Sequence, residues 1–339
     1  METPIPSAAK ANDYIRARLG KSPTIGMLTL LSEITEIGLP IRVHDQNGLK
    51  VGNAQVRREG IDLHLPEGTF TEGVFAHEAV RALLETRGWP RLFGEPVAAG
   101  TWHYLQRLIG MLDLAAGIRL QRRYELDCDT YELGMITAQW RRIVQLNRQK
   151  EELESKPMDD KDRIGYTLDV ALASVDQRWR VGSTPVPFIQ ALAMFPDARG
   201  IYDQILQATK TGVPQTGWQA RRAMKAMMDV VDGYLERTTG SRPMNAASQF
   251  VPSLHQDDAL RTVSQATTIV ETKLNDKGGG DFDIRIVNNR DGLGFSYQES
   301  FLAAAQAQKN LEAIGQENYA TFVRAKVPNS ILIWRPTGE

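Results

Sequence analysis

The chain has 339 residues, with 40 Lys or Arg residues against 41 Asp or Glu residues, so its formal net charge at pH 7 is −1. This balance gives no whole-chain electrostatic reason to expect a nucleic acid or an acidic membrane as partner. Cys128 is the single cysteine, which excludes a disulfide within the chain and a cysteine-rich zinc site.

Hydropathy and length limit the class of protein further. No apolar run approaches the length needed to cross a bilayer, and the first residues lack the basic and hydrophobic blocks of a secretory signal. We therefore expect a soluble, cytoplasmic protein that does not enter a membrane. The length exceeds that of a usual single domain and predicts two or three packed units.

The first residues predict two helices followed by a small antiparallel sheet. Small and apolar residues recur at helical spacing over residues 7–19 and 28–37. From Ile41 onward the spacing changes to alternation, and Asn47-Gly48 is typical of a hairpin turn. We expect strands at 41–45, 51–57 and 61–65.

Helices dominate the residues that follow. Thr69 or Thr71 can cap a helix that ends near Gly88, and the region 101–154 is mostly helical in its pattern. The charged stretch that follows contains a break near 156–160, where we expect a domain boundary. Beyond this boundary the pattern predicts helices at 166–179, 187–195, 198–209 and 217–237.

The last part of the chain mixes helices and strands. We expect a helix from about 257 to 274, a strand over 282–287, a helix over 297–314 and a strand over 330–334. The complete pattern predicts an α+β fold that is predominantly helical, with a small antiparallel sheet in its N-terminal half and a small α/β part at its C-terminal end.

The helix predicted after the first sheet carries the residues that bear most directly on chemistry. It contains His77-Glu78-Ala79-Val80-Arg81. In an H-E-x-x-H helix, two histidines four residues apart lie on one side and hold one zinc, while the glutamate handles the proton of a bound water. Arg81 stands where the second histidine is expected, and a guanidinium cannot coordinate a cation.

A second motif follows at Glu125-Leu126-Asp127-Cys128-Asp129. It resembles the E-x-x-A-D helix of gluzincin peptidases, in which the first acid is the third zinc ligand. The upstream order, with 61–65 as an edge strand before the active helix, is similar to that of the heat-shock and CAAX-processing type of zinc peptidase. The resemblance covers residues 41–133.

This resemblance implies a zincin-like fold with a degenerate metal site. His77 and Glu125 would be the remaining metal ligands, and Arg81 would form a structural ion pair with Glu125 in place of the metal charge. Together with the breaks in the pattern, the resemblance predicts a zincin-like α+β domain over 1–155, a helical domain over 156–245 and an α+β domain over 246–339.

Two functions follow from the resemblance. The first is a binding or structural protein without a cofactor, which has a protein partner or assembles with itself. The alternative is an atypical metal-dependent peptidase that binds zinc, with Glu78 as general base. A further ligand would then come from His64, His103, Asp127 or Asp129.

A simpler interpretation of these residues needs no metal site. His77 then packs on a helix face and Glu78 is solvated. The acids of the second motif pair with the neighbouring arginines, Arg122 and Arg123.

Overall fold

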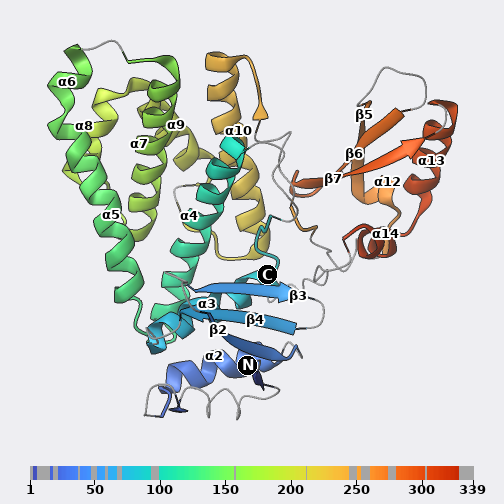
Figure 1. Ribbon diagram of the computed structural model, residues 1–339, viewed down its shortest axis with the longest axis horizontal. Helices are drawn as coiled ribbons and strands as arrows, with labels where there is room; N and C mark the ends of the chain where they lie inside the picture. Colours follow the sequence, from blue (N-terminus) through green and yellow to red (C-terminus); the bar gives the residue numbers. More distant parts are fainter. Residues whose placement is uncertain are drawn as a thin grey trace.

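The computed structural model is a predominantly helical α+β protein with a four-stranded and a three-stranded sheet among its described residues, which confirms the expected fold class (Figure 1). The described residues are 3–5, 16–17, 22–36, 39–46, 52–57, 60–66, 71–92, 99–155, 158–210, 212–243, 250–252, 260–273, 280–301 and 304–327. The expected helix over 7–19, apart from residues 16–17, and the expected strand over 330–334 lie outside them.

The N-terminal sheet is mixed rather than antiparallel. Its strands are β1 (Thr3–Ile5), β2 (Ile41–Gln46), β3 (Asn53–Arg57) and β4 (Gly60–Pro66), in the order β1-β2-β4-β3. β2 and β4 pair in parallel, whereas the β1/β2 and β3/β4 pairs are antiparallel. The edge next to β4 is therefore β3, and the strand expected at the edge, 61–65, lies inside the sheet. Alternation of apolar residues fixes which face is buried but not which strand is the neighbour.

Two helices form a hydrophobic core with the buried face of this sheet. They are α2 (Ile25–Glu36) and α3 (Glu72–Thr86), which confirms the helix expected at 28–37 and the helix that carries His77. The Val74 amide donates to Thr71 Oγ1 at 3.2 Å, so Thr71 is the N-cap. Phe75 and Ala79 of α3 are fully buried in this core.

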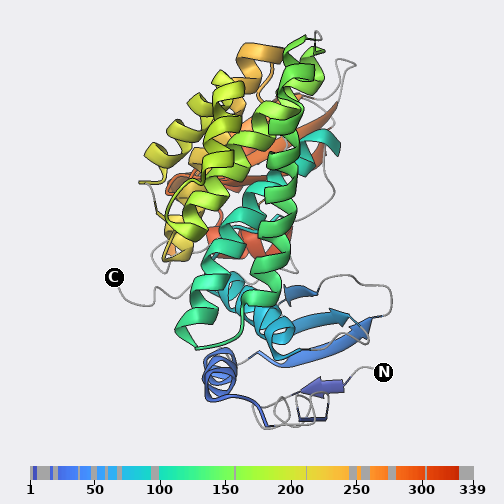
Figure 2. The ribbon, with the colours of Figure 1, turned by 90° about the vertical axis from the view of Figure 1, so that its left-hand side faces the viewer.

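Seven helices form the central part of the described chain. They are α4 (Ala99–Arg123), α5 (Asp129–Arg148), α6 (Lys150–Ser155), α7 (Asp160–Val181), α8 (Val186–Met194), α9 (Pro196–Ala208) and α10 (Gly217–Thr239), and the four helices expected beyond residue 160 are confirmed. Figure 2 shows α4 and α5 rising from the N-terminal sheet. α4 packs on α3 and also on α7 and α10. Because one hydrophobic core contains residues from both sides of position 155, the three-domain division stays a prediction.

The C-terminal part is built on an antiparallel sheet of order β5-β6-β7. Its elements are α12 (Val263–Ala266), β5 (Thr267–Lys273), β6 (Gly280–Asn288), β7 (Gly294–Phe301), α13 (Ala304–Gln316) and α14 (Tyr319–Lys326). The strand expected over 282–287 is confirmed. The helix expected to reach residue 274 is wrong over β5, and the helix expected from residue 297 begins only after β7. Both segments are rich in β-branched or aromatic residues, and β6 between them supplies both pairing partners.

A buried ion pair connects α10 to the C-terminal sheet. Arg221 pairs with Asp291 in the β6–β7 connection, and its Nη1 donates to the Val251 carbonyl at 3.0 Å. Across the described chain, every helix is too short or too polar to span a bilayer.

Candidate functional site

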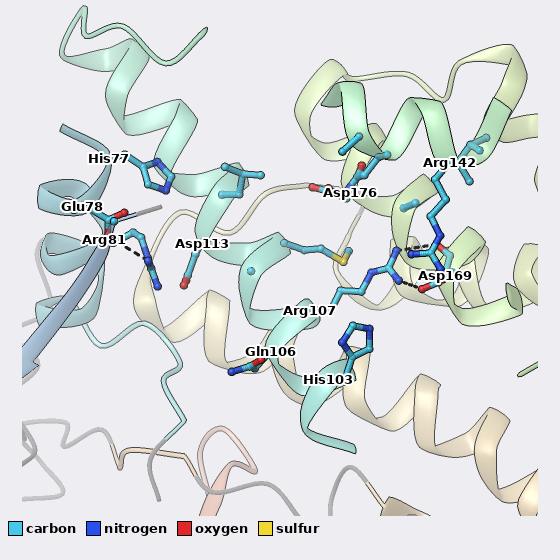
Figure 3. A pocket seen from close by; sticks show the side chains of 18 of the residues that line it. His77, Glu78, Arg81, His103, Gln106, Arg107, Asp113, Arg142, Asp169 and Asp176 are labelled. Carbon is cyan, nitrogen blue, oxygen red and sulfur yellow. Dashed lines mark hydrogen bonds and ion pairs between the residues drawn. The ribbon is translucent and has the colours of Figure 1, made fainter. Parts of the chain in front are cut away.

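A cavity of about 600 Å³ is lined by residues of α3, α4, α5 and α7, together with Gly52 just before β3. Figure 3 shows that its charged side chains form two groups, one at the α3 side and one near α5 and α7. The first group is His77, Glu78, Arg81 and Asp113, and the second is Arg107, Arg142, Asp169 and Asp176. Apolar side chains also line the cavity, among them Met111, Leu114, Ile143, Leu146 and Ala173.

Arg81 and Glu78 form an ion pair at the first group. The distance from Arg81 Nη1 to Glu78 Oε2 is 3.2 Å, and the Glu78 side chain is only 1% exposed. Burial lowers the pKa of Arg81, but Glu78, Asp113 and Glu85 more than offset this effect, so the pKa is raised overall. Arg81 is therefore a permanent cation held among carboxylates.

Gly52 fixes the position of Glu78 from the side of the sheet. A Cβ atom on Gly52 would lie 2.6 Å from Glu78 Cγ and 2.7 Å from Oε1. The chain can enter β3 directly against this carboxylate only because residue 52 has no side chain. Glu78 is consequently covered by the edge of the sheet.

Asp113 is the functional candidate that the sequence analysis missed. It lies on α4, and its side chain points toward Arg81 at the same end of the cavity (Figure 3). Burial raises its pKa to about 7, and Glu85 and Glu78 raise it while Arg81 and Arg91 lower it. Its carboxyl makes no hydrogen bond or ion pair with any described residue. One signal was available in the sequence: Asp113 is the single acid in the 25 residues of α4.

His77 lies at the same end of the cavity and is buried. Burial lowers its pKa to about 4, and the nearby Arg81 charge lowers it as well, while a contact with Gln121 raises it. The imidazole is therefore neutral at pH 7. A neutral imidazole beside a carboxyl is suitable for a metal ligand, but here the Arg81 guanidinium lies next to both groups.

The structure does not bring Glu125 to this cavity. α4 ends at Arg123, and Glu125 lies exposed in the turn before α5, with φ 56°. The expected E-x-x-C-D helix is thus interrupted, and Cys128 is the N-cap residue of α5. The expected pair of Arg81 with Glu125 is replaced by the pair of Arg81 with Glu78.

Packing of the turn explains why the helix stops. A Cβ atom on Gly26 of α2 would lie 1.6 Å from the Tyr124 carbonyl oxygen, and one on Gly73 of α3 would lie 2.8 Å from that of Asp127. The turn is therefore held between two glycines that are distant from it in sequence. Local helical propensity is overridden by this tertiary contact.

The other expected ligands are dispersed. His64 stacks on His44 with 4.7 Å between the ring centroids, on neighbouring strands of the sheet. His103 is exposed at the second end of the cavity and packs against Tyr104. Asp127 is exposed in the α4–α5 turn, and the side chain of Asp129 lies outside the described residues. No group of three or more His, Cys, Asp or Glu side chains in the described part of the chain is arranged to hold a metal.

The second group of charged residues is a network of shared ion pairs. Arg107 and Arg142 both pair with the Asp169 carboxylate, and Arg107 Nη2 also donates to the Asp169 carbonyl at 2.9 Å. Deeper in the wall, Asp176 pairs with Arg180, and both side chains are almost completely buried. Burial raises the pKa of Asp176, which Arg180 opposes.

Comparisons with protein-family models, with curated proteins and with solved structures found no match.

Proposed function

We propose that this protein is a non-catalytic binding protein on a degenerate zincin-like scaffold, with a small-molecule site in the cavity beside Arg81. The observation that carries the proposal is the position of the Arg81 guanidinium, which pairs with Glu78 and faces Asp113 (Figure 3). In this arrangement a cation of the protein occupies the place that a zinc ion would take between the acids.

The surroundings of α3 support the zincin-like part of the proposal. The helix that carries His77 and Glu78 packs beside β3, which is the edge strand of the sheet. The next helix, α4, presents Asp113 to the same space. Asp113 therefore takes the place of the acidic zinc ligand that the resemblance gave to Glu125.

The electrostatics favour binding over metal-dependent hydrolysis. A fixed guanidinium among the candidate ligands opposes a divalent cation in the same space, because like charges repel strongly in a partly desolvated site. Glu78 is buried and already paired, so it cannot act as a general base without breaking its ion pair with Arg81. The expected protein partner or self-assembly stays a prediction.

The dimensions of the cavity support a small-molecule ligand. Its volume of about 600 Å³ lies within the range of roughly 300–1,000 Å³ that is usual for ligand sites. The lining is largely apolar with a few charged groups at its ends, which is the usual composition of such sites.

The test is to replace the Arg81 guanidinium by an imidazole, which can ligate zinc. We expect Arg81→His to bind zinc with about one ion per chain through His77, the introduced imidazole and Asp113. Wild type and the Arg81→Gln control, which loses the charge without gaining a ligand, should bind none tightly. Metal content after dialysis and calorimetric zinc titration measure this.

Two outcomes would contradict the proposal. Stoichiometric zinc in the wild-type protein, lost in a His77→Ala variant, would favour the metal-dependent peptidase with Glu78 as base. Failure of Arg81→His to gain zinc affinity, while the variant remains folded by circular dichroism, would show that His77, residue 81 and Asp113 do not converge. Adding Asp113→Asn to Arg81→His should weaken zinc binding at least about tenfold.

A further inference from the structure

The two ends of the cavity carry opposite excess charges. Among the described residues, Glu78, Asp113 and Arg81 line the α3 end, and Glu85 and Arg91 lie outside the lining but act on these groups electrostatically. Arg81 pairs with Glu78, and Arg91 pairs with Glu85 at 2.6 Å. Asp113 is therefore the carboxyl in excess, and this end has one unbalanced negative charge when Asp113 is ionised.

The opposite end has the reverse imbalance. Among the described residues, the guanidinium groups of Arg107 and Arg142 in the lining, with Arg180 behind it, pair with two carboxylates, Asp169 and Asp176. One positive charge is therefore in excess. The Arg142 side chain is 61% exposed, so its guanidinium is accessible to a ligand that enters the cavity.

The two ends are separated by a short apolar wall. Arg107 and Asp113 are six residues apart on α4, which corresponds to a rise of about 9 Å along the helix axis. Met111 of α4 and Ile143 and Leu146 of α5 line the cavity as well. A ligand that contacts both ends must therefore have an aliphatic middle of limited length.

We propose that the cavity binds a zwitterion, with its ammonium group at Asp113, its carboxylate at Arg107 and Arg142, and a short apolar segment between them. The inference rests on the proposed function, since it names the ligand class of the same cavity. A guanidinium binds a carboxylate through paired N–H donors, and the Asp113 carboxyl, which makes no hydrogen bond or ion pair with a described residue, offers the matching acceptor for an ammonium group. Arg81 is matched one to one by Glu78, whereas Arg107 and Arg142 share the single carboxylate of Asp169 and keep N–H donors for a ligand carboxylate.

A series of linear ω-amino carboxylates, measured by isothermal titration calorimetry on the full chain, tests the spacing. We expect affinity to rise from glycine to 6-aminohexanoate and to fall again for longer chains. Hexanoate and hexylamine, each of which lacks one charge, should bind about tenfold more weakly than 6-aminohexanoate, a difference of about 1.4 kcal/mol.

Substitutions at each end test the assignment of the charges. Asp113→Asn should reduce the affinity for 6-aminohexanoate to that for hexanoate and leave hexanoate binding unchanged. Arg142→Gln should weaken both carboxylates but not hexylamine. Arg199→Gln, on an exposed pair of α9 with Asp203, is the matched control and should change none of these affinities.

Triglycine distinguishes two sources of such a zwitterion, because it carries the same terminal charges on a polar backbone. Tighter binding of triglycine would assign the site to short peptides, and tighter binding of 6-aminohexanoate to aliphatic amino acids. Both results support the zwitterion. Absence of binding by every compound, or equal affinity for hexanoate and 6-aminohexanoate, would overturn it.

The metal content of the same samples separates this inference from the proposed function. The ω-amino carboxylates contain no peptide bond, so their binding does not depend on any hydrolytic activity. Zinc in the wild-type protein would contradict the proposed function and leave the length series interpretable. A metal-free protein that binds no zwitterion would overturn only the ligand class.

Discussion

The two ends of the cavity use the same residue types but balance them differently. Near α7, Asp169 and Asp176 are each paired with arginine, and Asp169 is shared by two guanidinium groups. Near α3, Arg81 pairs with Glu78, and Asp113 makes no hydrogen bond or ion pair with another described residue. At the α7 end every carboxylate is paired with at least one arginine, whereas the α3 end holds a carboxyl that costs stability whenever it is ionised. A carboxyl with a raised pKa at a cavity wall is typical of a functional position.

The largest effect should come from breaking an ion pair at the α7 end. Arg180→Met leaves the Asp176 carboxylate buried beside Gln139 without its cation. We expect the free energy of unfolding to fall by about 3–5 kcal/mol, measured by urea denaturation. The double variant Arg180→Met/Asp176→Asn should recover part of this loss. An equal loss in both variants would mean that packing of the arginine chain, rather than its charge, provides the stability.

At the α3 end, removing a charged side chain should increase the free energy of unfolding instead of lowering it. Asp113 has a usual pKa of 3.8 that is raised to about 7 in the folded protein, so between these values the folded state binds the proton and the unfolded state does not. This group therefore makes stability fall as pH rises from about 4 to 7. Asp113→Asn should stabilise the protein by on the order of 2–4 kcal/mol at pH 8 and by almost nothing at pH 4.

The measurement for Asp113 is the difference in unfolding free energy between variant and wild type across that pH range. In this difference, the contributions of the titrating groups that both proteins share cancel. A difference that stays constant with pH would show that Asp113 titrates normally, and the contrast between the two ends would then disappear. Asp169→Asn, at the α7 end, is the matched control and should destabilise at pH 8.

A smaller effect is expected where the sheet covers Glu78. Gly52→Ala places a methyl group 2.6 Å from Glu78 Cγ, and we expect it to destabilise the protein by about 1–3 kcal/mol. Gly110→Ala is the matched control, because it lines the same cavity and has no atom within 4 Å of the added Cβ. That control should be neutral or stabilising by about 0.5–1 kcal/mol. Thermal and urea unfolding compare them, and similar losses in both variants would contradict close packing on Glu78.

Helix existence in this chain was predictable because the pattern that specifies it is local. The helices of the middle region follow the apolar spacing, and Pro and Gly residues separate them. The expected elements are wrong where pairing with a neighbouring strand decides whether a segment is a helix or a strand. The segments Thr267–Lys273 and Gly294–Phe301 are strands since β6 lies between them, and no local pattern encodes that neighbour.

Of the candidate site, only the residues on α3 were predictable from the sequence. His77, Glu78 and Arg81 are close in sequence and lie on one helix, so their proximity follows from the helical period. The acid that faces Arg81 comes from a different helix, more than thirty residues away. Motif matching selected Glu125 for this place, but the structure supplies Asp113.

By itself, then, the sequence determined that residue 81 on α3 is a cation four residues after His77, because residue identity fixes charge. Only the tertiary structure decided which acids surround that cation. The α4–α5 turn is packed against Gly26 and Gly73, so α4 ends before Glu125 and its Asp113 faces the cavity. Such a choice depends on how helices distant in sequence pack against each other, and packing is a property of the whole chain rather than of any one motif.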